Sequence, residues 1–162
     1  MKHGSILSLL TVLFLAVLLQ APPVAAAQPQ EASGTFAIVE QTPVATQITD
    51  GNIILTVDET IAVSGDFEGT LTITTVYNFH PNSTFTSRSK GAFTGTLFGG
   101  AEGMLTYSSA GRGDWTMVAG NPVPDTFEGQ NAFRGTGGGL DGLKGQGSFD
   151  APNYTEFVHF AP

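Results

Sequence analysis

Ser64-Gly65-Asp66-Phe67-Glu68-Gly69-Thr70, echoed at Gly142-Leu143-Lys144-Gly145-Gln146-Gly147-Ser148, places glycine every second to fourth residue beside small or aromatic side chains. In antiparallel sheets this pattern is typical of bulges, bends and tight turns, because glycine alone accepts positive φ without a steric penalty. Both stretches therefore indicate a β-rich fold.

The segments around the first stretch alternate between apolar and polar residues. In residues 53–63 the odd positions are apolar except for Glu59, and in residues 67–79 the odd positions from Phe67 to Phe79 form a second apolar face. Such alternation predicts strands with one buried face and one solvated face. It also predicts that Leu71, Ile73 and Tyr77 point inward, whereas Thr70, Thr72 and Thr74 point outward.

Further strands are expected at short intervals along the chain, so that the full set is 34–40, 53–63, 67–79, 84–98, 102–109, 114–119, 145–150 and 154–160. Turn residues at 80–83, 99–100, 111–113 and 152–153 separate them. Several of these strands are long, at ~11–15 residues against a usual length of about 5–6. We therefore predict an all-β, eight-stranded antiparallel barrel, with an immunoglobulin-like sandwich as the alternative.

The N-terminus has the pattern of a signal peptide. Lys2 and His3 precede an apolar run from Ile6 to Leu19, and Ala25-Ala26-Ala27 provides a small-residue cleavage site. The run is shorter than the roughly 20 residues of a membrane-spanning helix. The chain has no cysteine, which argues against a lipoprotein. We expect cleavage of residues 1–27, a flexible leader at 28–33, and one domain over 34–162 that is secreted or periplasmic.

The composition excludes two classes of partner. The chain carries six basic and 14 acidic residues, a formal net charge of −8 at pH 7. Such a charge repels nucleic acid and anionic membrane surfaces.

One irregular segment, residues 119–134, contains two prolines and two phenylalanines without alternation. We expect it to form a long hairpin loop with Phe127 and Phe133 against the barrel mouth.

Several pieces of the chain resemble a bacterial family of small proteins known only as a domain of unknown function. They are Ser33–Phe36, Ser64–Gly69, Phe93–Leu97 with Gly100 and Gly103, and Gly135–Gly137 leading into Leu140–Phe149. The resemblance implies a barrel similar to those of allene oxide cyclases and dirigent proteins, and association into homo-oligomers. This chain differs in its export signal and in its long 119–134 segment. The resemblance carries over no reaction.

Glu59 is the strongest candidate for a functional residue. An unpartnered carboxylate on an apolar strand face carries a desolvation cost of several kcal/mol. Glu59 should therefore be paired, protonated or beside a wet cavity, unless a bulge turns it outward. Tyr77 lies on the same face of the next strand and is expected to hydrogen bond with it. Tyr107 and Trp115 are expected to add an aromatic wall to a ligand site.

The patterns of other sites are missing. His80 and His159 lack a second metal ligand at a recognisable spacing, so neither a metal nor another cofactor is expected. There is no Gly-x-Ser-x-Gly motif for a nucleophile. Three functions remain open: a secreted module that binds a small apolar molecule in the barrel or at its mouth; an isomerase or cyclase that uses Glu59 and Tyr77; and a structural or interaction protein with a solid core.

Overall fold

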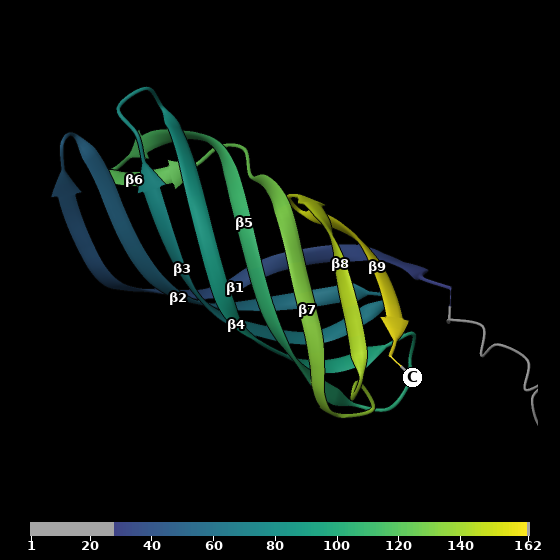
Figure 1. Ribbon diagram of the computed structural model, residues 1–162. Helices are drawn as coiled ribbons and strands as arrows, with labels where there is room; N and C mark the ends of the chain where they lie inside the picture. The colour runs from purple at the N-terminus through teal and green to yellow at the C-terminus, as the bar shows by residue number, and fades with distance from the viewer. Residues whose placement is uncertain (1–27, 162) are drawn as a thin grey trace, which may run out of the picture.

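The chain folds into antiparallel strands joined by short turns (Figure 1). This computed structural model describes residues 28–161, so the expected signal peptide at residues 1–27 lies outside the described residues. The strands are β1 (Gln30–Thr49), β2 (Asn52–Gly65), β3 (Phe67–Phe79), β4 (Thr84–Leu97), β5 (Gly103–Val118), β6 (Asn121–Pro124), β7 (Glu128–Gly138), β8 (Leu143–Asp150) and β9 (Asn153–Phe160). Residues 28–161 contain no helix, and hence none that is long and apolar enough to cross a membrane. The all-β prediction is confirmed.

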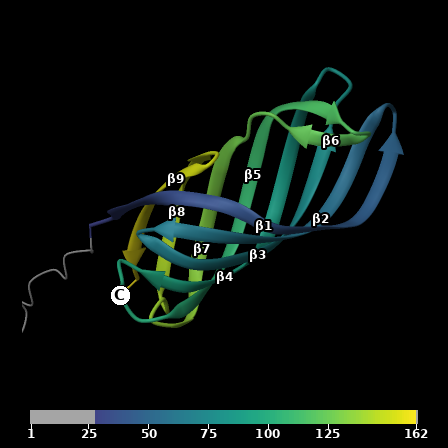
Figure 2. The same cartoon turned by 180° about the vertical axis from the view of Figure 1, so that it is seen from behind.

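The strands form one sheet whose hydrogen bonding closes on itself. The order is β4-β3-β2-β1-β9-β8-β7-β5-β6, and β4 also pairs with β5, which joins the two sides of the sheet into a ring of eight strands. β6 pairs only with the last residues of β5, outside that ring. Figure 2 shows from behind how the first part of β1 reaches β9. Because each ring strand has a neighbour on both sides, the chain does not form the two separate sheets of a sandwich.

β1 is much longer than the predicted strand at 34–40. Its first residues, Gln30–Thr35, pair with β9, and Gly34–Thr49 pair with β2, so that Gly34 and Thr35 pair on both sides. The expected leader at 28–33 is therefore wrong from Gln30 onward, since this segment is needed to close the ring. Two register shifts, near Val39 and Val44, interrupt the pairing of β1 with β2, as β-bulges do.

The predicted pattern differs from the structure most between residues 102 and 138. The expected strands 102–109 and 114–119 are a single strand, β5, and the expected turn at 111–113 lies inside it. A Cβ atom at Gly111 would clash with the ring of Phe127, and one at Gly113 would clash with the Thr126 carbonyl and the ring of Phe85. The expected loop at 119–134 contains β6 and the first half of β7. The eight predicted strands therefore do not match the nine strands of residues 28–161 one to one, because two of them are parts of β5, and β6 and β7 were not predicted.

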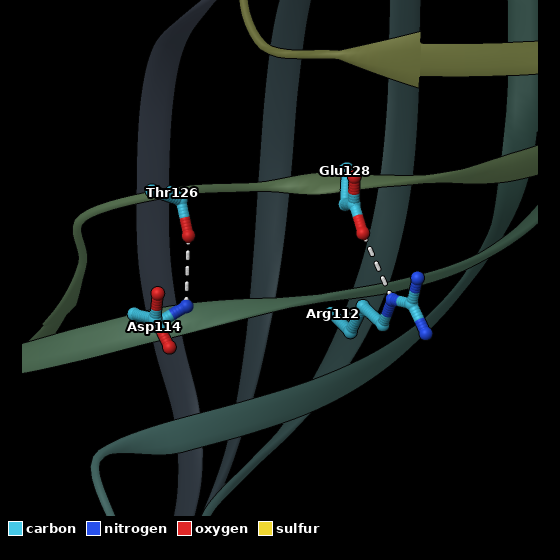
Figure 3. A network of polar contacts seen from close by, with 4 residues as sticks. All are labelled: Arg112, Asp114, Thr126 and Glu128. Carbon is cyan, nitrogen blue, oxygen red and sulfur yellow. Dashed lines mark hydrogen bonds and ion pairs between the residues drawn. The ribbon is translucent and has the colours of Figure 1, made fainter.

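Cross-strand contacts hold the start of β7, and the residues just before it, to β5 (Figure 3). Arg112 Nε lies 2.9 Å from Glu128 Oε1, and the Asp114 amide donates a 2.9 Å hydrogen bond to Thr126 Oγ1. Both side chains of the ion pair are more than half exposed, so the pair contributes less than about 1 kcal/mol. The ion pair joins two residues that lie directly opposite each other in the register of β5 and β7.

Two apolar clusters fill the interior. One contains Phe79, Phe85, Tyr77 and Val57. The larger one combines apolar side chains from every ring strand, among them Phe67, Leu71, Ile73, Phe133 and Leu143. Phe127 is partly buried and packs against both clusters. The predicted orientation of β3 is confirmed, because Leu71, Ile73 and Tyr77 are buried and Thr70, Thr72 and Thr74 are exposed.

The two faces of β3 should differ sharply in their contribution to stability. Ile73 is only 6% exposed, so Ile73→Ala should lower the free energy of unfolding by about 2–5 kcal/mol. Thr72→Ala, on the solvated face, should change it by less than about 1 kcal/mol. Urea denaturation of both variants measures this, and equal losses would contradict the orientation of β3.

Candidate functional site

Glu59 points into the ring, as the alternation in β2 predicts. It is 3% exposed and lies between the buried Val57 and Ile61, whereas Asp58 is exposed. The pairing of β2 with β3 runs from Ile53 to Val63 without a register shift. No bulge in this pairing therefore turns the carboxylate outward, and the Glu59 side chain lies in the interior of the ring.

Three donors satisfy the Glu59 carboxylate. Gln41 Nε2 donates to Oε1 at 2.7 Å, Tyr77 OH donates to the same oxygen at 3.1 Å, and Thr75 Oγ1 donates to Oε2 at 2.5 Å. Since the Thr75 proton is used in this way, Ser89 Oγ donates to Thr75 at 2.9 Å. Both carboxylate oxygens are therefore partnered, which offsets much of the cost of burying them.

Tyr77 is held as a neutral donor. Burial raises the pKa of its phenol well above the ordinary value, and the neighbouring charge and hydrogen bond of Glu59 raise it further. The predicted contact between Glu59 and Tyr77 is therefore present in the structure, with the proton on Tyr77.

A second buried carboxyl was not predicted. Glu156 on β9 is 4% exposed and lies between the buried Tyr154 and Val158. The signal that could have found it is the one that found Glu59, an acidic residue on the apolar face of an alternating strand. Here the strand is short and the signal correspondingly weaker.

Glu156 has far fewer partners than Glu59. Asn131 Nδ2 donates to its Oε1 at 2.6 Å, while Glu156 Oε2 and Asn131 Oδ1 are buried without a hydrogen-bond partner. Gly147 faces this carboxyl from β8, and a side chain at that position would clash with Oε2. Burial raises the pKa of Glu156 to about 7, and the Asn131 hydrogen bond offsets only part of this effect.

The strand register aligns the small polar side chains of the interior in one row. Thr75 pairs with Ser89, Ser89 with Ser109, Ser109 with Asn131, Asn131 with Gly147, and Gly147 with Glu156. The row thus crosses β3, β4, β5, β7, β8 and β9 at one level of the ring. One end of the row is Thr75, which hydrogen bonds to Glu59. At the other end, Gly147 faces Glu156 Oε2.

A cavity of about 90 Å³ lies beside this row. Both carboxyls line it, together with Tyr107, Ser109, Asn131 and a largely aromatic wall that includes Phe67, Phe93, Phe133, Phe149 and Tyr154. Burial raises the pKa of Tyr107, and contacts with Asn131 and Ser109 partly counteract it. The structure therefore places three of the predicted residues, Glu59, Tyr77 and Tyr107, around one cavity.

Trp115 does not lie at this cavity. The expectation that it adds to the aromatic wall of a ligand site is therefore corrected. Its ring packs on Phe79 at a centroid distance of 5.3 Å, and its Nε1 donates to the His80 carbonyl at 3.0 Å. It is not among the residues that line the cavity. The reason is that Trp115 pairs with Pro124 of β6, beyond the part of β5 that forms the ring.

The described residues do not bring together a metal centre. Between residues 28 and 161 there is no cluster of three or more histidine, cysteine, aspartate or glutamate side chains that could hold a metal ion. His80 instead has its Nδ1 2.8 Å from Asn52 Oδ1.

Comparison with known proteins identifies a similar fold and no activity. No family model matches the chain, and no curated protein does. Among solved structures, the chain is similar to a protein of unknown function from the DUF3224 family of Shewanella oneidensis MR-1. The TM-score is 0.64 at 17% sequence identity, over 83% of this chain and 99% of that one. This neighbour is consistent with the resemblance to a bacterial domain of unknown function.

The buried Glu156 carboxyl should make stability depend on pH. Its pKa is about 7 in the folded protein against an ordinary 4.5, so the folded state holds a proton that the unfolded chain releases between these values. Stability should then fall as the pH rises from 4.5 to 7, by at most ~3 kcal/mol from this group. Tyr107 and Tyr154 face the same region, but their raised pKa values keep them neutral throughout this range.

Glu156→Gln should remove this contribution, measured as the difference between wild-type and variant unfolding free energies from pH 4 to 8. The exposed Glu68→Gln is the matched control for loss of one negative charge. Parallel profiles for wild type and Glu156→Gln would contradict the burial of this carboxyl.

Proposed function

We propose that the closed ring is an eight-stranded barrel of the allene-oxide-cyclase-like type, and that the protein is an exported module that binds a small molecule inside it. The observation that carries the proposal is the cavity beside Glu156, where an apolar wall surrounds buried polar atoms without partners. Buried polar groups normally find partners. A ligand with a hydrogen-bonding group and an apolar body would supply them.

The size of the cavity restricts the ligand. Cavities of about 150 Å³ hold benzene, and a single water needs ~10–15 Å³. At about 90 Å³ the site is smaller than this benzene cavity, and it suits a molecule with fewer non-hydrogen atoms than benzene, or a few waters, without rearrangement of the core. A carrier of large apolar molecules would have a wider, open barrel lumen. The ligand of this cavity is smaller than the molecules that such a carrier binds.

An acid–base isomerase is the second candidate, and the pKa of Glu156 favours it. A carboxyl that titrates near neutral pH can both donate and accept a proton under working conditions. In this version Glu156 replaces Glu59 as the acid–base group, because both oxygens of Glu59 already accept hydrogen bonds. Turnover of a bound compound, lost in Glu156→Gln while binding remains, would distinguish the isomerase from the binding module.

Export is proposed from residues 1–27 alone. The mature protein should lack these residues, since the small-residue site at Ala25-Ala26-Ala27 precedes Gln28. Intact mass spectrometry of the protein released by its producer measures the N-terminus. A released species that still carries Met1 would contradict the assignment of a cleaved signal peptide.

The cavity should be occupied in protein taken from its natural producer. Native mass spectrometry should detect a bound small molecule that is lost on denaturation. Ser109→Leu should prevent this, because Ser109 lines the cavity and leucine adds an apolar group to it. The control is Ser108→Leu on the exposed face of the same strand, which should retain the bound mass. A ligand-free wild-type protein, or equal occupancy in both variants, would contradict binding in this cavity.

A further inference from the structure

The charges of the protein are unequally divided between its interior and its surface. Glu59 and Glu156 are the two buried carboxyls of the described residues, at 3% and 4% exposure. All five lysines and arginines of residues 28–161 are exposed: Arg88, Lys90, Arg112, Arg134 and Lys144. Buried acids are ordinarily paired with a cation or with several hydrogen-bond donors. Glu59 has the donors, whereas Glu156 has one amide and no cation.

The unpartnered atoms beside the cavity are both acceptors. Glu156 Oε2 carries the carboxyl charge when ionised, and Asn131 Oδ1 is an amide oxygen belonging to the residue that already donates to Glu156. Ser109 pairs with Asn131 in the strand register and adds a hydroxyl to the same wall. Neither the Ser109 hydroxyl nor any other side chain of the described residues donates to these two atoms, so a group with two or three N–H bonds would supply the missing hydrogen bonds.

The remaining wall favours a cation over a neutral donor. Tyr107, Phe133, Phe149 and Tyr154 line the cavity on β5, β7, β8 and β9, the strands around Glu156. Aromatic faces attract ammonium groups, and the attraction grows when water is excluded. A charge-assisted hydrogen bond to a carboxylate is roughly twice as strong as a neutral one.

We propose that the ligand of this cavity is a small organic monocation, a primary ammonium group on a short apolar chain, with its nitrogen between Glu156 and Asn131. The proposal rests on the proposed binding function and specifies its ligand class. The ammonium group donates to Glu156 Oε2 and Asn131 Oδ1, and the chain lies against the aromatic wall. A small anion would meet the Glu156 charge, and an alcohol would supply one donor and no charge.

Matched probes test the ligand class. Isobutylamine, isobutanol and propionate each have five non-hydrogen atoms and differ in charge at pH 8. Calorimetric or NMR titration of the exported protein, freed of bound molecules, should show the amine binding at least about tenfold more tightly than the alcohol. Propionate should not bind. Glu156→Gln should bring the amine and the alcohol to within about threefold of each other, whereas the exposed Glu68→Gln should keep the preference.

Three outcomes would overturn the proposal. If isobutanol binds wild type as tightly as isobutylamine, the cavity binds ligands but does not select cations. If amine binding survives in Ser109→Leu, the amine binds the acidic exterior instead of the cavity. If none of the probes binds, the bound mass found by native mass spectrometry decides the rest: its presence leaves the binding function standing, and its absence removes both. The comparison of isobutylamine with isobutanol uses the wild-type protein, so this part of the test does not depend on whether a variant folds.

Discussion

The pairing of β1 with β9 is the contact on which the interior depends, because it joins the first and last strands of the ring. Only residues 30–35 of β1 take part, opposite residues 153–158 of β9. Tyr154 reinforces the seam from inside, since the Phe67 amide at the start of β3 donates to its hydroxyl at 3.1 Å, past β1 and β2. Outside, the Ser33 amide donates to Asp66 Oδ2 at 2.8 Å. Without this closure, Glu156 on β9 would lie at an exposed sheet edge.

Closure places two acids in the same interior with different consequences. Glu59 is surrounded by side chains that donate to it, so its burial is compensated within the protein. Glu156 is compensated by one amide, and its pKa rises accordingly. Replacing such a group by an apolar residue is often neutral or stabilising. A carboxyl kept in this position at a cost in stability is therefore more easily understood as part of a site than as part of the core.

The sequence predicted the parts of the fold whose strands alternate regularly. Residues 53–63 and 67–79 show the buried and exposed faces directly, and from them the Glu59–Tyr77 contact follows. β7 and the middle of β5 could not be predicted in this way. Their inward positions include Gly111, Gly113 and Gly129, where aromatic rings from other segments cover the backbone. These contacts come from residues that are distant in the sequence. From the local sequence alone, such glycines indicate turns. Glu156 was missed although β9 alternates, and its relation to Asn131 depends on register across three strands.

The central claim is that Glu156 lies in a poorly solvated cavity with one carboxyl oxygen unpartnered. The most direct measurement is an NMR titration of the protein with ¹³C-labelled glutamate carboxyl groups, with Glu156 assigned by comparison with Glu156→Gln. The account predicts an inflection at pH about 7 for this carboxyl. An inflection near the ordinary value of 4.5 would show that water reaches the group, and would contradict both the buried site and the ligand proposed for it.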